Sequence, residues 1–219
     1  MSGIIINPYS VVPASVPFVN TYSLDLDGVD EYVESSYTGN VTSLSLWFKP
    51  NTTITTSSSA QCLVGFQNGS PYSGIYLGMY AGSIIDELIT IKTTASANAS
   101  YYSQLGGSIS NDWHHLVIVG TGTQYDIYLD NVNVFTANLG GDVGLINASR
   151  LDIGCRILGV VTLPFEGNID ELSIYTSELS SSQVSDLWND GTPTDLSSFE
   201  VAPVAWYRNG DSTKALYFN

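Results

Sequence analysis

The stretch FEGNIDELSIY, residues 165–175, concentrates three acidic side chains in a run that otherwise has the pattern of a β-strand. Side chains at every second position of a strand share one face. The apolar positions are odd-numbered up to Ile169 and even-numbered from Leu172 onward, so the apolar face changes within the run. This change predicts a strand with a β-bulge near Asp170 and Glu171.

The acidic residues at this bulge allow two structural explanations. A bulge frees backbone carbonyl groups, and Ca²⁺ prefers carboxylate and carbonyl oxygens as ligands. Alternatively, Asp170 caps a turn by accepting hydrogen bonds from backbone N–H groups, and Glu171 faces solvent. We favour the cap over the cation.

Short strand patterns recur along the whole chain of 219 residues. They consist of alternating or continuous apolar runs separated by Ser, Thr, Asn and Gly, and they fall in residues 45–48, 74–80, 88–92, 116–119, 125–129 and 151–153. Many short strands at close spacing are typical of an antiparallel sandwich or barrel and not of a βαβ fold. The length suits one large β-domain, or one domain with tails.

Two local motifs add detail to this pattern. Residues 130–131, Asp-Asn, both tolerate positive φ and predict a two-residue hairpin turn. Ser180 followed by Gln183 is a capping-box pattern, and apolar residues then recur at helical spacing up to Trp188. We predict one short helix here, with Trp188 as the anchor that docks it on the sandwich.

The chain carries a formal net charge of −15 with only six Lys and Arg residues. Such a charge repels phosphate backbones and anionic headgroups, so we expect no nucleic-acid binding and no membrane insertion. No apolar run reaches the length of a membrane-spanning helix, and the N-terminus lacks the basic region of a secretory signal. Cys62 and Cys155 are too few for a disulfide scaffold, and we favour free thiols.

Four stretches in a particular order resemble a known family. They are SLDLDGVDEYVE (23–34), SLSLWFKP (43–50), NDWHHLVIVGTGTQYDIYLDNVNV (111–134) and FEGNIDELSIYTSELSSSQVSDLWNDG (165–191). Together they are similar to a laminin-G-like domain of the concanavalin-A-like lectin/glucanase superfamily. The resemblance implies an all-β fold, an antiparallel jelly-roll β-sandwich with one short C-terminal helix, over residues 22–191. An extended N-terminal arm (1–21) and a C-terminal extension (192–219) would flank it.

The resemblance also bears on the acidic residues. In related folds the Asp-Gly turn after the first strand lies near the closing strand. Asp27 and Asp30 at that turn, together with Asp170, are therefore the candidate ligands of a structural Ca²⁺. A bound cation would also offset part of the negative charge of the chain.

Hydrolysis of a polysaccharide would need acidic residues that flank the scissile bond. The glucanases of the superfamily carry an acidic triplet at alternating positions, whereas the acidic pairs here, 86–87 and 170–171, are adjacent and point to opposite strand faces. His114 and His115 are the only histidines, and we interpret His115 as a hydrogen-bonded packing residue. We predict that the protein is not an enzyme.

The surface composition favours sugar binding. Tyr occurs 14 times and is accompanied by Asn, Ser and Thr in the loops. Sugars offer an apolar ring face to aromatic side chains and hydroxyl groups to polar ones. Tyr72, Tyr101 and Tyr102 are the candidate glycan platform, and the alternative is that they cover the sandwich or an oligomer interface.

The ends of the chain suggest partners. The opening MSGIIINPYS and the tail AWYRNGD resemble, more softly, virion proteins of tailed phages. Three prolines keep the apolar N-terminal arm out of a helix or a central strand, so we expect a virion subunit or a second copy of the chain to cover it. The alternative is that the arm folds back on its own sandwich.

We therefore predict a lectin-like surface protein of a phage particle, made in the host cytoplasm and adhering to glycans as a decoration, knob or fibre component. A purely structural virion protein and a carbohydrate-binding module of a secreted glycoside hydrolase are the alternatives.

Overall fold

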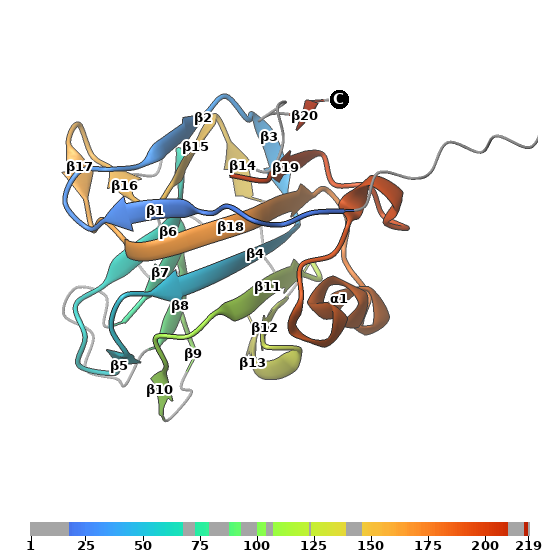
Figure 1. The fold of residues 1–219 in the computed structure, drawn as a ribbon, viewed down its shortest axis with the longest axis horizontal. Helices are drawn as coiled ribbons and strands as arrows, with labels where there is room; N and C mark the ends of the chain where they lie inside the picture. Colours follow the sequence, from blue (N-terminus) through green and yellow to red (C-terminus); the bar gives the residue numbers. More distant parts are fainter. Residues whose placement is uncertain are drawn as a thin grey trace, which may run out of the picture.

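The computed structural model describes residues 18–67, 73–78, 88–92, 100–103, 107–122, 124–138, 146–209 and 217–218. Two antiparallel β-sheets pack face to face, and one short α-helix lies outside them (Figure 1). Within these residues, the predicted all-β jelly-roll sandwich with one short C-terminal helix is confirmed.

The larger sheet has eight strands in the described part of the chain, in the order β13-β12-β11-β4-β18-β19-β20, with β1 paired to β18 beside this path. The strands are β1 (Leu24–Asp27), β4 (Ser43–Pro50), β11 (His114–Gly120), β12 (Gln124–Leu129), β13 (Val132–Asn138), β18 (Glu166–Tyr175), β19 (Ala205–Tyr207) and β20 (Tyr217–Phe218). Strand β18 pairs with β4, β1 and β19. The stretch 165–175 therefore organises this sheet.

The smaller sheet has six described strands in the order β2-β15-β6-β7-β8-β9. They are β2 (Val33–Ser35), β6 (Gln61–Gln67), β7 (Gly74–Leu77), β8 (Ile89–Lys92), β9 (Ser100–Ser103) and β15 (Arg150–Ile153). Three short antiparallel pairs complete the described strands: β3 (Gly39–Val41) with β14 (Ile146–Ala148), β5 (Ile54–Thr55) with β10 (Ser108–Ile109), and β16 (Arg156–Ile157) with β17 (Val161–Thr162).

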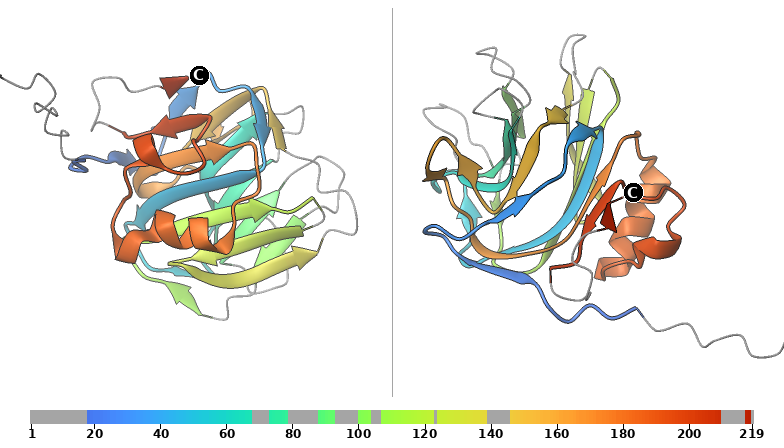
Figure 2. Two further views of the ribbon diagram at one scale, coloured as in Figure 1. Left: turned by 90° about the vertical axis from the view of Figure 1, so that its right-hand side faces the viewer. Right: turned by 90° about the horizontal axis from the view of Figure 1, so that it is seen from above.

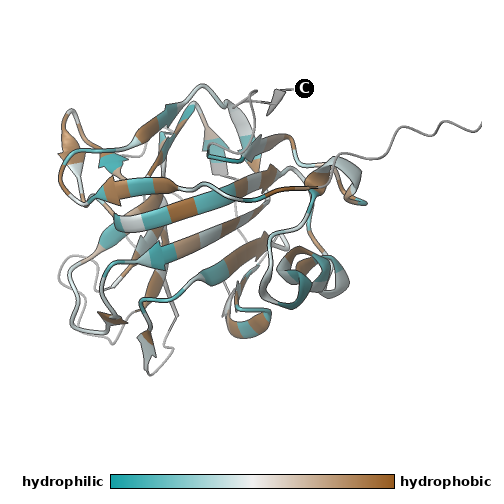
Figure 3. Cartoon of the chain, in the orientation of Figure 1, coloured by the Kyte–Doolittle hydropathy of each residue, from teal (hydrophilic) through white to brown (hydrophobic). Residues whose placement is uncertain are grey.

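The main core lies between the two sheets, as strand alternation requires. Leu46 and Phe48 of β4 are fully buried in this core, and Trp47 between them points to the opposite face of the sheet. Figure 3 shows the same alternation of hydrophobic and hydrophilic residues along β18. The outward-facing row of the larger sheet therefore contains residues that the core does not use.

The predicted bulge lies in β18. The pairing of β18 with β4 shifts register between Asp170 and Ser173, and Glu171 has a φ of 50°. As a result Ile169 and Leu172, which differ in parity, both enter the main core. The change of apolar face in the sequence is thus absorbed by the bulge, and the prediction is confirmed.

The helix α1 (Ser181–Trp188) packs on the outer face of the larger sheet (Figure 2). Ser180 caps it, and the Ser180–Gln183 capping box is present as predicted. Val184 and Leu187 are buried in a second apolar cluster with Val117, Val119 and Tyr175 of the sheet. Short 3-10 turns follow at Asn189–Gly191 and Leu196–Ser198.

Part of the predicted C-terminal extension belongs to the larger sheet. Strand β19 at residues 205–207 pairs with β18, and Trp206 joins the second apolar cluster. The predicted arm also touches this region, because the Phe18 ring stacks on Trp206 with centroids 6.3 Å apart. The described base of the arm therefore lies against its own sandwich, and residues 1–17 lie outside the described residues.

Two further features agree with the sequence. Asp130 and Asn131 have φ values of 50° and 65° and connect β12 to β13 in a two-residue turn. Cys62 and Cys155 are buried free thiols, and burial raises the pKa of Cys155 to about 12. No helix in the described residues is both long enough and apolar enough to cross a membrane.

Candidate functional site

Strand register brings three side chains into one row across the outer face of the larger sheet. Trp47 pairs with His115 on one side and with Asp170 on the other. Directly opposed residues of antiparallel strands point to the same face. An aromatic ring, an imidazole and a carboxylate therefore lie side by side on a surface outside the main core.

The helix α1 covers one end of this row. The Trp188 ring stacks on Trp47 with centroids 5.4 Å apart and an angle of 12° between the planes, and it lies 6.0 Å from the His115 ring. Trp188 is thus the docking anchor that the sequence predicted.

The imidazole in the row is a packing group, as predicted. His115 is buried, and its Nε2 is 2.8 Å from the Ser45 hydroxyl. Burial lowers the pKa of His115 to about 3, so the ring is neutral at physiological pH.

The other end of the row opens into a cleft of about 280 Å³. Segments distant in sequence form its walls: the strap before β1, the outward row of the sheet, the residue before β11, and the turn after α1. The lining residues are Asn20, Thr21, Tyr22, Ser23, Trp47, Trp113, Asp170, Gly191 and Pro193. The volume is just below the range of about 300–1,000 Å³ for drug-sized ligands, which suits about one or two sugar rings.

The cleft combines exposed aromatic rings with polar groups. Trp113 is 41% exposed and Tyr22 is 64% exposed, whereas Trp47 is buried at 5%. Side-chain amide, hydroxyl and carboxyl groups lie among these rings. Aromatic faces stack on apolar surfaces and the polar groups fix orientation by hydrogen bonds, which is the chemistry that a sugar ring requires.

The strap that forms one wall is held by the C-terminal segment. The guanidinium of Arg208 lies 4.6 Å from the centroid of the Phe18 ring and 5.2 Å from that of Trp206, and it donates a hydrogen bond to the Val19 carbonyl. Because residues 20–23 follow directly, this clamp sets where the strap lines the cleft.

The two carboxylates at the bulge have different surroundings. Asp170 Oδ1 accepts a hydrogen bond of 2.8 Å from the Glu171 N–H, as the predicted cap requires. The prediction that Glu171 faces solvent is wrong, because Glu171 is only 4% exposed. Its carboxylate accepts the indole N–H of Trp206 and lies 3.3 Å from Nε of Arg208. Both partners come from the predicted C-terminal extension, which returns to the sheet as β19 beside β18.

The structure separates the candidate calcium ligands. Asp27 pairs with Glu166, four residues before Asp170 on β18, which corresponds to about 13 Å along the strand. Asp27 Oδ1 accepts the Val29 N–H at 2.8 Å in the turn, and Asp30 is exposed. Among the described residues, no group of three or more His, Cys, Asp or Glu side chains is arranged to hold a metal ion.

The candidate tyrosine platform falls at the edge of the described structure. Tyr101 and Tyr102 lie on β9, where their backbones pair with Ile91 and Thr90 of β8. Tyr72 lies outside the described residues. Strand β9 belongs to the smaller sheet, whereas the cleft lies on the larger sheet.

Sequence reasoning missed the aromatic lining of the cleft. Trp47 and Trp113 lie in the stretches used for the family resemblance, but they were not considered as ligand contacts. Alternation alone places Trp47 on the face opposite Leu46 and Phe48, so strand parity could have identified it as an outward residue. The Asp170 partner followed only from the register of β4 with β18.

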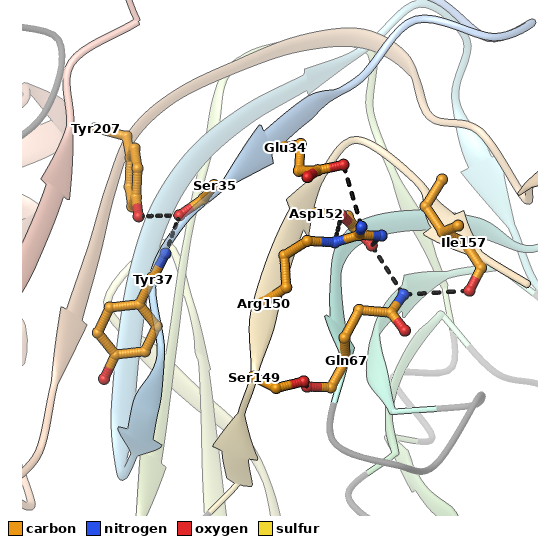
Figure 4. A network of polar contacts seen from close by, with 9 residues as sticks. All are labelled: Glu34, Ser35, Tyr37, Gln67, Ser149, Arg150, Asp152, Ile157 and Tyr207. Atoms are coloured by element: carbon orange, nitrogen blue, oxygen red, sulfur yellow. Dashed lines mark hydrogen bonds and ion pairs between the residues drawn. The ribbon is translucent and has the colours of Figure 1, made fainter.

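The outer face of the smaller sheet holds a second polar cluster (Figure 4). Arg150 is 2.9 Å from Asp152 and 3.1 Å from Glu34, and Figure 4 shows it between the two carboxylates. The Gln67 amide donates to Asp152 at 2.9 Å and to the Ile157 carbonyl at 3.2 Å, which ties β6 to β16. Asp152 is fully buried, so this cluster is part of the packing of the fold.

The sequence itself defines the class of this protein. A laminin-G-type family model, described as the concanavalin A-like lectin/glucanases superfamily, matches residues 27–185. The match spans more than half of the chain, and the protein belongs to this superfamily.

Solved structures share the fold at low sequence identity. A putative carbohydrate-binding protein from Bacteroides ovatus has 16% identity and a TM-score of 0.55, over 87% of this chain and 54% of that one. A pentraxin from Limulus polyphemus has 16% identity and a TM-score of 0.52, over 74% and 79%. The CBM40 of a Ruminococcus gnavus sialidase has 11% identity and a TM-score of 0.50, over 74% and 95%. A search of curated protein sequences found no match.

Proposed function

We propose that this protein is a non-enzymatic carbohydrate-binding protein and that the cleft beside Trp47 is its binding site. The observation that carries the proposal is the juxtaposition of Trp47, Trp113 and Tyr22 with the Asp170 carboxylate in one cleft. The exposed Trp113 and Tyr22 rings stack on the apolar face of a sugar, and Asp170 accepts hydrogen bonds from its hydroxyl groups.

The similar folds support this proposal. The Bacteroides ovatus protein is described as a putative carbohydrate-binding protein, and the Ruminococcus gnavus domain is a carbohydrate-binding module of a sialidase. At these identities they share only the fold with this chain, so the contacts in the cleft carry the argument for the site.

The arrangement of the carboxylates favours binding without catalysis. Glycoside hydrolysis needs two carboxyl groups on either side of the bond, about 5–9 Å apart. Glu171 is adjacent to Asp170, and Trp206 and Arg208 hold its carboxylate away from the cleft lining. We therefore expect bound oligosaccharides to remain intact.

An exposed aromatic residue at the cleft offers a direct test. Trp113→Ala should weaken binding of a glycan, identified on an array, by about tenfold, equivalent to about 1.4 kcal/mol, and leave the melting temperature nearly unchanged. Tyr32→Ala is the matched control, since Tyr32 is an exposed aromatic residue outside the cleft lining. Equal effects of the two substitutions on affinity would contradict the proposed site.

We also propose that the protein works on the surface of a phage particle. The support is the resemblance of its opening, MSGIIINPYS, and of its tail, AWYRNGD, to virion proteins of tailed phages. The tail part of this resemblance has another explanation, because Trp206 and Arg208 of AWYRNGD hold Glu171 within the sandwich. The opening MSGIIINPYS therefore carries more weight. An antibody against the protein should label purified particles, and unlabelled particles would contradict this placement.

The N-terminal arm is the proposed contact with other subunits or with a second copy. Phe18 and Val19, at the described base of the arm, contact Trp206 and Arg208 of the same chain. Deletion of residues 1–17 should leave a folded monomer and abolish assembly. A deletion variant that unfolds would show that the arm completes its own sandwich.

A further inference from the structure

We infer that Ser110 is an activated nucleophile that takes an acyl group from an activated ester. Ser110, His114 and Asp130 form a chain of hydrogen bonds where β11 begins and the turn after β12 approaches it. Ser110 Oγ lies 3.0 Å from His114 Nε2, and His114 Nδ1 lies 2.7 Å from Asp130 Oδ2. These three side chains are not among the described residues that line the cleft, so the inference goes beyond carbohydrate binding.

The backbone of β11 holds the carboxylate of this chain in place. Asp130 Oδ1 accepts the N–H of His115 at 2.8 Å, and the N–H of Asp130 donates to the His115 carbonyl at 2.9 Å. The Phe48 ring packs against the imidazole of His114 with centroids 5.7 Å apart. Because a carboxylate only accepts hydrogen bonds, the neutral imidazole carries its proton on Nδ1 and leaves Nε2 to accept one. This is the geometry in which a histidine and an aspartate activate a serine.

The nucleophile lies at the solvent side of the chain. Ser110 is only partly buried, and Asn111 and Asp112 after it are exposed, so a small ester can reach Oγ. The N–H of Asp112 donates to Ser110 Oγ at 3.3 Å and helps to position it. The hydroxyl can also donate to Asp112 Oδ2 at 3.0 Å. It therefore has two acceptors, and His114 Nε2 is the one that can serve as a base near neutral pH.

The proposed step needs only the ester and the protein. When Oγ attacks the carbonyl carbon, a C–Oγ bond forms and the hydroxyl proton passes to His114 Nε2. The bond from the carbonyl carbon to the ester oxygen then breaks, and the alcohol leaves with this proton. Asp130 stabilises the imidazolium that exists in between. A single acylation of this kind is compatible with a protein that binds its glycans without turning them over.

A fluorophosphonate probe tests the wild-type protein directly. Its phosphorus takes the place of the carbonyl carbon, and the P–F bond breaks as a stable P–Oγ bond forms. Peptide mass spectrometry should find Ser110 labelled at least about tenfold faster than Ser108, an exposed serine of the same segment. Equal rates at the two serines would overturn the inference. They would leave the proposed function standing, because this experiment contains no glycan.

Two substitutions of the same kind separate the two acceptors. Asp130→Asn keeps an oxygen for the His115 N–H and turns an amide donor towards Nδ1, which moves the imidazole proton to Nε2. Labelling of Ser110 should then fall at least about tenfold. Asp112→Asn makes the same change beside Ser110 and should not slow labelling. Equal decreases in both variants would contradict the role of His114 as the base.

The pH dependence of labelling distinguishes a base from a merely structural histidine. Burial lowers the pKa of His114, but its hydrogen bond with Asp130 and the charges of Asp130 and Asp112 raise the pKa overall. The labelling rate of Ser110 should rise as the pH passes this pKa and then level off, because only the neutral imidazole accepts a proton. Labelling of Ser108 should continue to rise with the hydroxide concentration. A Ser110 rate that parallels the Ser108 rate at every pH would overturn the inference.

Discussion

Asp152 lies on the outer face of the smaller sheet, and Asp170 lies on the outer face of the larger sheet. Both carboxylates are buried, yet their surroundings differ. Arg150 and Gln67 contact Asp152 directly, whereas Asp170 lines a cleft next to Glu171, whose carboxylate contacts Arg208. The first carboxylate joins neighbouring strands, and the second lies in the wall of the proposed binding cleft.

The segments that cover the two faces explain this difference. On the smaller sheet, a Cβ at Gly65 would come within 2.6 Å of the Cys155 carbonyl oxygen, so the segment leading into β16 lies directly on the strands there. On the larger sheet, α1 reaches only as far as Trp47 and His115. The cleft is the space that the helix leaves beside the strap of residues 20–23. A covering segment thus decides whether a polar face becomes packing or a site.

The largest expected effect concerns pH and the covered end of the larger sheet. The folded pKa of His115 is about 3, below its usual value of about 6.5. The unfolded chain therefore binds more protons between these values, and stability present above pH 6.5 is lost as the pH falls towards 3. Protonation of His115 should lower the free energy of unfolding of the wild type by about 4 kcal/mol over this pH range. Urea unfolding should therefore show that this free energy falls more steeply with decreasing pH in the wild type than in His115→Asn.

His114 supplies a control of opposite sign. Burial lowers its pKa, but the hydrogen bond with Asp130 at 2.7 Å and the charge of that residue outweigh this and raise the pKa overall. Its contribution is present below the unfolded pKa and is lost as the pH rises through the folded pKa. His114→Asn should therefore weaken the protein more at pH 5 than at pH 8. Identical dependences of the free energy of unfolding on pH in His115→Asn and His114→Asn would contradict the different roles of the two histidines.

The next effect concerns the cluster on the smaller sheet. Arg150→Ala leaves the Asp152 carboxylate buried without its guanidinium partner and should lower the free energy of unfolding by about 3 kcal/mol. Glu34→Ala removes the exposed partner of the same arginine and should cost less than about 1 kcal/mol. Chemical unfolding measures the free energy of unfolding of both variants. Similar decreases in the two would mean that the burial of Asp152 does not make its ion pair with Arg150 the stronger one.

A smaller effect is expected at the clamp of the larger sheet. Arg208→Ala removes the cation beside buried Glu171 and the contact with the Val19 carbonyl, and should cost about 2 kcal/mol. Because this clamp positions residues 20–23 in the wall of the cleft, the affinity for a glycan should also fall. Arg150→Ala, measured where it remains folded, should leave glycan affinity unchanged, since Arg150 lies on the other sheet. Weakened glycan binding in both variants would contradict the different roles assigned to the outer faces of the two sheets.

The smallest effect is expected from metal removal. The register places Asp27 opposite Glu166 and not beside Asp170, and the described residues hold no cluster of metal-ligating side chains, so we expect excess chelator to shift the melting temperature by less than about 1 °C. A clear drop that disappears in Asp170→Ala would instead support the calcium site that the sequence predicts.

Much of the fold was accessible from the sequence because it depends on local patterns. Alternation located the strands, the capping box located α1, and the change of parity located the bulge in β18. The return of residues 205–208 to β18 was not accessible, since a three-residue strand has almost no periodicity. The burial of Glu171 depends on this return, and so the prediction of its exposure failed.

The candidate site was less accessible, because it is built from contacts between distant segments. Tyr101 and Tyr102 of the predicted tyrosine platform lie on β9 of the smaller sheet. By contrast, the cleft is lined by residues 20–23, Trp47, Trp113 and Asp170, which meet only through strand register and the position of α1. Strand parity could place Trp47 on the outer face of the sheet. It could not show which part of the Trp47 ring α1 covers and which part it leaves open to the cleft.

The indole N–H signals of the four tryptophans, followed by NMR during titration with a glycan that binds, test the central claim most directly. Trp47 and Trp113 line the cleft, so their signals should shift. The indole of Trp206 donates to Glu171 outside the lining, and its signal should change least. Saturable binding with unchanged Trp47 and Trp113 signals would place the carbohydrate site elsewhere and contradict the account.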